Sequence, residues 1–290
     1  MTLNRRRFLS IAAAFAATPA VATPHSWRGW AFGAEVEITL SGPRAIAQRT
    51  LRQAQDHIAQ LEQRFTLFQP ESELVRLNAH GSIAPSAAML HVMQVADRAH
   101  QITEGCFDPT VQPLWKALAE GRDPKLALAS MGWRQVRFDK DLVQLGQGQE
   151  LTFNGIAQGY ATDVISDFLI AQGFNAALVN IGEYRATGGD WRLGIADPLH
   201  GLLATRRLSK GAIATSSPMA TPLGKDGHIL HTTQRPHWST VSVEAESAAM
   251  ADALSTGLVL ANLELVRKVR HSDGVYRITL VDDAGDLTTL

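Results

Sequence analysis

Helical and strand-like spacings of apolar residues succeed one another from residue 34 to residue 281, and no repeat or linker rich in Pro, Gly and Ser interrupts them. Apolar residues recur every three or four positions on a helix, whereas on a half-buried strand they alternate with polar ones. Helices and strands that follow one another without a break must bury their apolar faces against each other. A chain of 290 residues is long enough for such a core. The sequence therefore predicts a single compact α+β domain of mixed strands and several long helices over residues 23–290.

The individual elements are predicted from these two spacings. The clearest helix has Leu51, Ala54, Ile58 and Leu61 on one stripe. Helical spacing covers residues 44–65, 87–102, 160–171 (ended by Gly173) and 247–260. Strand-like runs are residues 34–40, 136–138, 142–145, 151–153, 177–181, 191–196, 212–215, 239–243 and 276–281.

Residues 1–22 have the pattern of an export signal. Three arginines, Arg5 to Arg7, precede Phe-Leu and an apolar run over residues 11–17, and the small-residue site Ala20-Val21-Ala22 follows. Paired arginines before such a run indicate the twin-arginine route. The alternative is an anchor helix, but the run is shorter than the roughly 20 residues that span a bilayer. We therefore expect cleavage after Ala22 and a periplasmic mature protein without a membrane span.

Charge and cysteine content exclude some classes of protein. Lys and Arg together number 27 and Asp and Glu 28, so the charge balance gives no case for a nucleic-acid partner. A few oriented donors with a metal still suffice to bind a small anion. The single cysteine, Cys106, excludes an internal disulfide. A nucleophilic role is possible for Cys106, but a small buried side chain is the favoured interpretation.

Two polar segments have loop chemistry that a simple structural role also explains. Residues 65–74 leave a helix, turn at Pro70 and begin a new helical turn at Ser72. Residues 105–111 contain Asp108-Pro109, which holds Asp108 extended and directs its carboxylate to nearby groups. For residues 65–74 the structural alternative is a helix–turn–helix connection, and for residues 105–111 it is an Asx-type turn. From the residues alone, each structural alternative is preferred over a functional role.

Two later segments are suited to binding an anion and a metal. Gly155 and Gly159 lie where the chain enters a helix, so backbone N–H groups there suit a pyrophosphate, although such a glycine pair is a weak signal alone. Asp252 and Thr256 share a helix face, and their oxygens form part of a ligand set that Mg²⁺ accepts. The alternative is that Thr256 bonds back to the Asp252 carbonyl while the aspartate is solvated.

Taken together and in order, these segments resemble the ApbE family, the FAD:protein FMN transferases. The likeness runs from about Trp30 to the C-terminus. It is carried by the motifs Phe-Asp-Pro-Thr-Val at 107–111, Gly-Ile-Ala-x-Gly-Tyr-Ala-x-Asp at 155–163, Val-Asn-Ile-Gly at 179–182, Ala-x-Ala-Thr-Ser at 212–216 and Ala-Asp-Ala-Leu-Ser-Thr at 251–256. The resemblance implies a domain that binds extended FAD, with Mg²⁺ at the pyrophosphate. It also implies transfer of the FMN moiety to a threonine or serine of a redox protein, with release of AMP.

The resemblance also implies roles for individual residues. Asp252 and Thr256 would be metal ligands, together with a backbone oxygen of Gly155. The residues implied to contact FAD are Phe32, Phe68, Cys106, Phe107, Asp108, Thr152 and Gln158. For the catalytic base the family has His-x-x-Asp-Pro-x-x-Gly, but residues 227–236 lack the Asp-Pro pair. His231 is taken as the base, with His228 as the neighbouring candidate.

The sequence departs from the family pattern at five positions of the same predicted pocket. Thr152 replaces an aspartate, and Gln158 replaces a lysine. The family's Gly-Gly-Asp is Gly182-Glu183-Tyr184, and Ser255 stands where a second acid sometimes occurs. Loss of one acid and one base leaves the local charge nearly unchanged, so FAD binding is compatible with these changes.

The function expected from the resemblance is Mg²⁺-dependent transfer of FMN from FAD to a periplasmic or membrane-linked redox protein, for instance a subunit of a respiratory reductase system. Because the His-Asp-Pro loop is altered, two alternatives stay open. One is an FAD-binding or carrier protein without transferase activity, and the other is an FAD pyrophosphatase that releases FMN to water.

Overall fold

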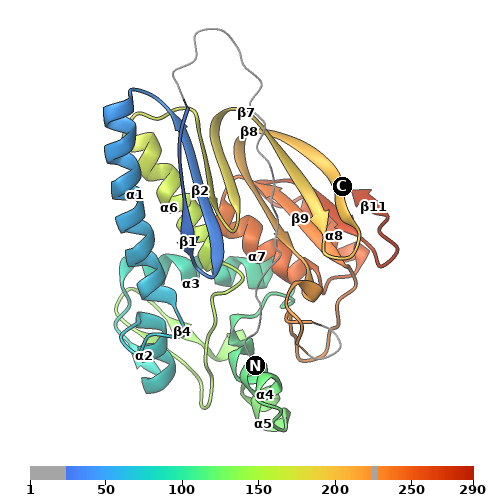
Figure 1. Cartoon of the computed structure of the whole chain (residues 1–290). Coiled ribbons are helices and arrows are strands. Elements are labelled where there is room, and N and C mark those ends of the chain that lie inside the picture. The colour runs from blue at the N-terminus through green and yellow to red at the C-terminus, as the bar shows by residue number, and fades with distance from the viewer. Residues whose placement is uncertain (1–23, 224–226) are drawn as a thin grey trace.

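An antiparallel sheet of eight strands forms one layer of the computed structural model, which describes residues 24–223 and 227–290 (Figure 1). The predicted export signal at residues 1–22 lies outside the described residues. In spatial order the strands are β1 (Pro24–Ala31), β2 (Ala34–Ser41), β6 (Ala177–Ile181), β7 (Tyr184–Asp197), β8 (Gly201–Ser216), β9 (Thr240–Ala245), β10 (Val275–Val281) and β11 (Leu287–Thr289). Every neighbouring pair in this sheet is antiparallel.

Helices cover one face of the sheet. The helices α6 (Ala157–Ala171) and α7 (Ala248–Leu258) lie against each other, α6 on β6 and β7, and α7 on β8 and β9. Outside them, α1 (Arg44–Phe65) packs on α6, α3 (Ala87–Ile102) on α7, and α8 (Leu263–Arg270) on β10. This arrangement buries the apolar stripes of the helices and the inner face of the sheet in two hydrophobic clusters, and Met250 on α7 packs against both.

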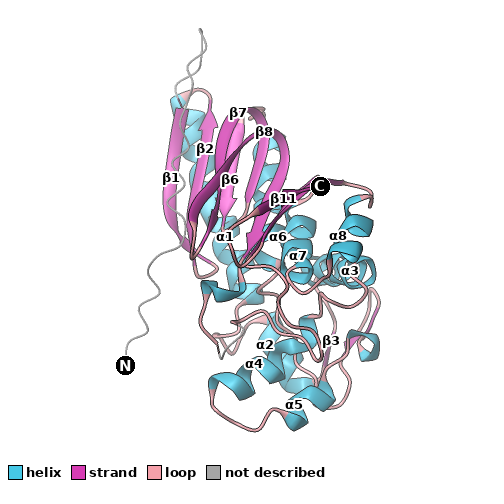
Figure 2. Cartoon of the chain, turned by 90° about the vertical axis from the view of Figure 1, so that its right-hand side faces the viewer, coloured by secondary structure: helices cyan, strands magenta, loops and turns pink. Residues whose placement is uncertain are grey.

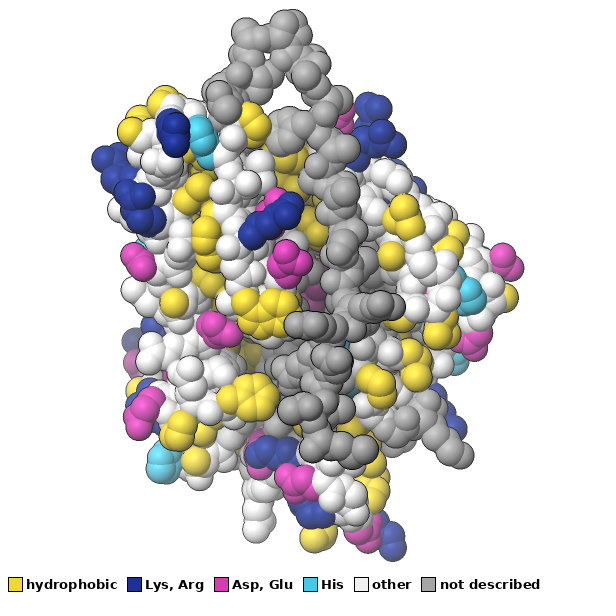
Figure 3. All heavy atoms as spheres, viewed as in Figure 1, with side chains coloured by type: hydrophobic (Ala, Val, Ile, Leu, Met, Phe, Trp, Pro, Cys, Tyr) yellow, Lys and Arg dark blue, Asp and Glu magenta, His cyan; other side chains and the backbone are white. Residues whose placement is uncertain are grey.

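A smaller region lies beyond one end of the sheet (Figure 2). Its helices are α2 (Glu73–His80), α4 (Gln112–Ala119) and α5 (Lys125–Ser130), and its short sheet consists of β3 (Ser82–Ile83), β5 (Val143–Gln144) and β4 (Arg137–Phe138). On the face seen in Figure 3, positively and negatively charged side chains of the described residues are interspersed, without a large patch of one sign. Within the described ranges, no helix has the length and apolar character needed to cross a membrane.

The α+β prediction is confirmed, and both α1 and α3 have the predicted bounds. The predicted strand at 151–153 is wrong. Asn78 binds the N–H and the carbonyl of Leu151 through its side chain, at 2.8 and 2.9 Å, and the N–H of Thr152 donates to Pro109 O at 2.9 Å. These backbone groups are therefore satisfied without a neighbouring strand.

Candidate active site

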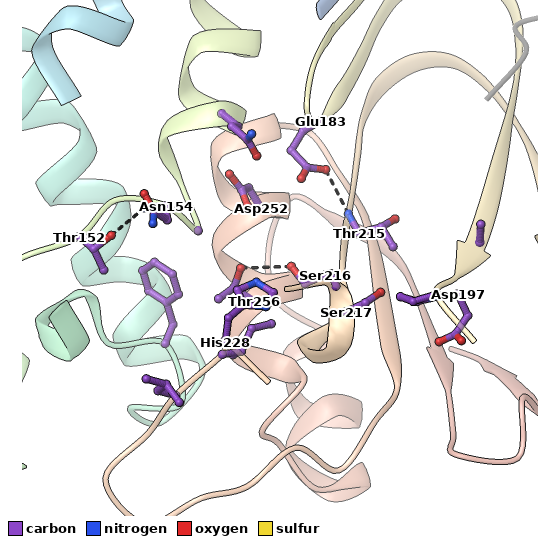
Figure 4. Close-up of a pocket in the computed structure, with 18 of the residues that line it drawn as sticks. Thr152, Asn154, Glu183, Asp197, Thr215, Ser216, Ser217, His228, Asp252 and Thr256 are labelled. Atoms are coloured by element: carbon purple, nitrogen blue, oxygen red, sulfur yellow. Dashed lines mark hydrogen bonds between the residues drawn. The ribbon is translucent and has the colours of Figure 1, made fainter. Parts of the chain in front are cut away.

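A cavity of about 750 Å³ opens where the N-terminal end of α6, the middle of α7, strands β7 and β8 and the segment at residues 106–112 come together. Side chains from each of these segments line it (Figure 4). Its polar and titratable lining residues include Asp108, Thr152, Asn154, Gln158, Glu183, Arg192, Asp197, Thr215, Ser216, Ser217, His228, Asp252 and Thr256.

The two glycines before and within α6 allow the close approach of α7. A Cβ on Gly159 would stand 2.3 Å from Ala248 O, and a Cβ on Gly155 would stand 2.8 Å from Thr256 Oγ1. Neither separation is compatible with a side chain, so the backbone of α6 touches α7 directly. The contact also lets the N–H of Gly159 donate to Asp252 Oδ2 at 3.1 Å. The glycine turn therefore lies against the predicted metal ligands.

Asp163, one turn further along α6, fixes the start of α7. Its carboxylate accepts hydrogen bonds from Ser247 Oγ at 2.7 Å and from the N–H groups of Ala248 and Ala249, each at 2.9 Å. The guanidinium of Arg185 pairs with Asp163 Oδ1 at 2.9 Å. A carboxylate at a helix N-terminus satisfies the unpaired N–H groups and stabilises the helix dipole. Asp163 therefore sets the position of α7 and of the side chains it carries.

Thr256 forms a hydroxyl cluster with the end of β8 and does not bond back to the Asp252 carbonyl. Ser216 Oγ lies 3.1 Å from Thr256 Oγ1 and 2.8 Å from Ser255 Oγ, and it is Ser255 Oγ that donates to Asp252 O, at 3.0 Å. Asp252 is only 3% exposed. The alternative in which Asp252 is solvated is therefore wrong.

Two buried carboxyl groups share this part of the cavity wall. Burial raises the pKa of Asp252 to about 7. Burial, together with the negative charge of Asp252, raises the pKa of Glu183 well above its ordinary value. Among the described residues lining the cavity, Arg192 on β7 is the only lysine or arginine, and its side chain is exposed. A buried carboxylate without a partner is costly, so this wall favours a bound cation or bound protons.

The donors fit Mg²⁺ in particular. Asp252 and Thr256 supply side-chain oxygens. Because Gly155 has no side chain, its own backbone can lie against the side chain of Thr256. No group of three or more His, Cys, Asp or Glu side chains in the described part of the chain is arranged to hold a metal. Mg²⁺ suits such an incomplete set, because it keeps waters and binds through one or two carboxylates plus substrate phosphates.

His228 lines the cavity, whereas His231 is not among the lining residues. His228 Nδ1 lies 2.8 Å from Pro218 O. Since a carbonyl only accepts hydrogen bonds, Nδ1 carries the proton of the neutral ring and Nε2 keeps its lone pair. Burial lowers the pKa of His228, against the opposing effect of the backbone of Pro218 and Thr221, and this favours the neutral ring.

His231 has a different environment in the loop after β8. Its Nδ1 accepts the N–H groups of Thr233 at 3.2 Å and Gln234 at 3.0 Å. The lone pair of the neutral ring is thereby engaged by the backbone of its own loop. Burial lowers its pKa, while the charge of Asp108 and a hydrogen bond to the backbone of Gly105 act to raise it. These contacts give His231 a role in loop structure.

Five of the seven residues implied to contact FAD line the cavity: Cys106, Phe107, Asp108, Thr152 and Gln158. Asp108 also forms the Asx-type turn that was its structural alternative, since its Oδ1 accepts Thr110 N at 2.8 Å and Thr110 Oγ1 at 2.6 Å. Burial raises the pKa of the Cys106 thiol, which keeps it protonated and inert.

Phe32 and Phe68 are not among the lining residues. Phe32 lies in the β1–β2 turn with a φ of 52°, and its carbonyl accepts the side-chain amide of Gln158 at 3.1 Å. It therefore reaches the cavity wall only through Gln158. Phe68 follows α1, and its side chain is 82% exposed.

One buried part of the cavity wall was not predicted from the sequence. Asp197 ends β7, and its Oδ2 accepts hydrogen bonds from Ser239 Oγ at 2.5 Å and Thr240 Oγ1 at 2.7 Å. Thr240 Oγ1 in turn lies 2.6 Å from the hydroxyl of Ser217, which lines the cavity. In the sequence, Asp197-Pro198 gives only a turn signal, and the partners are more than 40 residues away.

The model of the ApbE family matches residues 32–277, most of the chain. The chain belongs to the ApbE family. Among curated ApbE relatives, a FAD:protein FMN transferase of Vibrio cholerae is 29% identical over 276 residues, covering 82% of this chain and 81% of the relative. A FAD:protein FMN transferase of Escherichia coli K12 is 25% identical over 266 residues, covering 77% and 74%.

Solved ApbE structures share the fold over nearly the whole length. The ApbE protein of Thermotoga maritima superposes with a TM-score of 0.79 at 25% identity, covering 92% of this chain and 96% of that one. The flavin transferase ApbE of Vibrio cholerae gives a TM-score of 0.81 at 22% identity, covering 93% and 97%. The resemblance seen in the motifs is therefore confirmed at the level of family and fold.

Proposed function

We propose that this protein is a Mg²⁺-dependent FAD:protein FMN transferase. The observation that carries the proposal is the contact between the glycine turn of α6 and the Asp252–Thr256 face of α7, at the wall of a 750 Å³ cavity. A helix N-terminus preceded by glycine suits a pyrophosphate, and the opposing oxygens suit a divalent cation. Membership of the ApbE family and the names of its relatives support the same activity.

In the proposed reaction a hydroxyl oxygen of a threonine or serine on the acceptor attacks the phosphorus of the FMN moiety. A new P–O bond forms to the acceptor, the bond from that phosphorus to the bridging oxygen breaks, and AMP leaves with the electron pair. Mg²⁺, when bound, would polarise the phosphoanhydride and offset charge on the departing phosphate. Asp252, Thr256 and the backbone of Gly155 would hold it.

The acceptor hydroxyl must lose its proton, and we assign this role to His228 in place of His231. The Nε2 lone pair of His228 is set by the Nδ1 contact with Pro218 O, on a residue that lines the cavity. Proton removal by a positioned side chain requires an available lone pair near the reacting hydroxyl. His231 has its Nδ1 engaged by Thr233 and Gln234.

We further propose that the mature protein acts in the periplasm on a periplasmic or membrane-linked redox protein. The support is the arginine-rich start, apolar run and Ala20-Val21-Ala22 site within residues 1–22. Fusing these residues to a reporter that requires folded export tests the route. Loss of export when Arg5, Arg6 and Arg7 are replaced by lysine is the expected result, and unchanged export would refute the twin-arginine assignment.

Transfer is tested with purified mature protein, FAD, Mg²⁺ and a candidate acceptor domain. The expected result is a fluorescent acceptor band in a denaturing gel, with one AMP released for each FMN attached. Release of AMP with free FMN and an unlabelled acceptor would instead establish a pyrophosphatase. Retention of intact FAD without AMP would establish a carrier protein. An Asp252→Asn variant is the negative control for each product.

A further inference from the structure

Glu183 is a buried side chain of the cavity wall that the proposed function leaves without a role. It lies in the tight turn between β6 and β7, where Gly182 has a φ of 86°. The Glu183 carbonyl accepts the N–H of Ile181 at 3.1 Å and the hydroxyl of Thr162 at 3.2 Å. These bonds fix its backbone from β6 and α6 together, so the direction of its side chain is set by the fold.

The side chain of Glu183 is directed into the cavity beside Asp252. It is 7% exposed, and its Oε2 accepts the N–H of Thr215 at 3.1 Å. Figure 4 shows Glu183 and Asp252 reaching the same part of the cavity from the β6–β7 turn and from α7. Each carboxylate is thus held by one backbone N–H, from Thr215 and from Gly159 respectively.

No basic side chain compensates this pair in the described part of the chain, since neither residue takes part in an ion pair there. The side-chain amide of Gln158 packs on Gly182, the residue before Glu183. This amide is neutral and donates to Phe32 O, so it does not offset the charge of the two carboxylates. Two carboxylates in one buried wall repel each other, and a divalent cation between them removes both the repulsion and the burial cost.

We propose that Glu183 supplies a second carboxylate to the divalent cation held by Asp252 and Thr256, either directly or through a metal-bound water. This inference rests on the proposed function, because it assumes the same cation site. The resemblance to the ApbE family implies an aspartate where this chain has Thr152, and Glu183 places a carboxylate on the wall of the same cavity.

The test measures cation binding directly, without catalysis. Mn²⁺ is titrated into the mature protein, with and without FAD, and free Mn²⁺ is followed by electron paramagnetic resonance. Glu183→Gln keeps the size of the side chain and an oxygen for the Thr215 N–H. We expect it to weaken Mn²⁺ binding about 10-fold or more. Glu183→Asp keeps the negative charge on a shorter side chain, so its Mn²⁺ affinity should lie between those of wild-type protein and Glu183→Gln. Wild-type affinity in Glu183→Gln would overturn the inference.

Metal-free stability separates a ligand from a structural residue. As a ligand, Glu183 destabilises the metal-free protein by repulsion, so Glu183→Gln should melt at an equal or higher temperature without metal and gain less from added Mg²⁺. A lower melting temperature without metal, with an unchanged gain from Mg²⁺, would overturn the proposal. Glu264→Gln, on the exposed first turn of α8 and outside the cavity, is the matched control: it should change the melting temperature little and leave the gain from Mg²⁺ unchanged.

The two proposals fail in different ways. If wild-type protein binds Mn²⁺ through Glu183 but labels no acceptor and releases no AMP, the transferase proposal fails and the cation site stands. If wild-type protein labels the acceptor while Glu183→Gln binds Mn²⁺ with wild-type affinity, the inference about Glu183 fails alone.

Discussion

The carboxylate of Asp163 on α6 accepts a hydrogen bond from Ser247 Oγ at 2.7 Å, and this bond joins the middle of α6 to the N-terminus of α7. Two backbone N–H groups of α7 donate to the same carboxylate. Because Asp252 lies little more than one turn beyond Ser247, the position of the candidate metal ligand depends on a residue that does not line the cavity. The Asp that closes the Gly-Tyr-Ala-x-Asp motif is therefore best explained as a positioning residue.

Replacing Asp163 should weaken both the fold and cation binding. Asp163→Asn loses the charge that pairs with Arg185 and places an amide N–H₂ against N–H donors of α7. We expect a loss of about 1–3 kcal/mol in the free energy of unfolding and a higher Mg²⁺ requirement, measured by urea denaturation and Mg²⁺ titration. Asp167→Asn is the matched control: it is 66% exposed, lies one turn away and contacts the same arginine, so it should change both quantities little.

Asp252→Asn should abolish Mg²⁺-dependent AMP release while leaving the protein folded. The amide oxygen still accepts the N–H of Gly159, and a buried charge is removed, so stability without metal is expected to hold or rise. Loss of a direct ligand should reduce the rate on the order of 100-fold or more at fixed Mg²⁺. AMP is quantified by chromatography. A variant with normal AMP release would remove Asp252 from the cation site.

The two histidines should differ in their effect on transfer. His228→Ala is expected to reduce FMN transfer by roughly 10²- to 10⁴-fold with FAD binding retained, because it removes the proposed base. His231→Ala should have a smaller effect, through the loop that its Nδ1 organises. Labelling rates and FAD fluorescence titrations measure the two quantities. If His231→Ala instead causes the larger loss of rate, the assignment of the base is reversed.

The pKa of Asp252 predicts how stability without metal depends on pH. Burial raises this pKa to about 7 in the folded protein, from an unfolded value of about 3.9. The folded state therefore binds more protons between these values, and this group's contribution to stability falls as pH rises from about 4 to about 7. Saturating Mg²⁺ should cancel this loss of stability, since the bound cation replaces the proton on Asp252.

Thermal unfolding of wild-type protein and Asp252→Asn at pH 5 and pH 8 measures this contribution together with the effect of the Asp252 charge on Glu183, because titrating groups remote from Asp252 contribute equally in the two proteins. Wild-type protein should lose more stability than the variant between pH 5 and pH 8 in the absence of Mg²⁺. Equal losses in the two proteins would contradict a charged, buried Asp252.

The elements best predicted from sequence are those in which local spacing and burial agree. In α1 the apolar stripe lies on the core, and the predicted bounds of 44–65 match. The helical spacing predicts a start of α6 at residue 160, whereas the helix begins at Ala157. Gly159 opposes helix formation locally, but the contact with Ala248 requires glycine there. Tertiary packing thus overrides a local propensity that sequence alone cannot weigh.

The candidate site shows the same division between local and distant information. Asp252 and Thr256 are four residues apart on one helix, so their shared face is visible in the sequence. Glu183 and Asp197 enter the cavity through strand pairing of β6, β7 and β8, which no local pattern specifies. The choice between His228 and His231 depended on which ring nitrogen meets a carbonyl, and this is a property of the folded loop.

Gly159→Ala tests whether the contact between α6 and α7 sets the cation site. The added Cβ would meet Ala248 O at 2.3 Å, and because this atom belongs to a helix backbone it cannot turn away. We expect α7 to shift, with a loss of about 1–3 kcal/mol or more in the free energy of unfolding and weaker Mn²⁺ binding. Gly121→Ala is the control: its φ is positive and its surroundings are open, so it carries only the backbone cost of about 1 kcal/mol. A Gly159→Ala protein that loses stability but binds Mn²⁺ with wild-type affinity would show that the site tolerates movement of α7, and the positioning role given to this contact would be wrong.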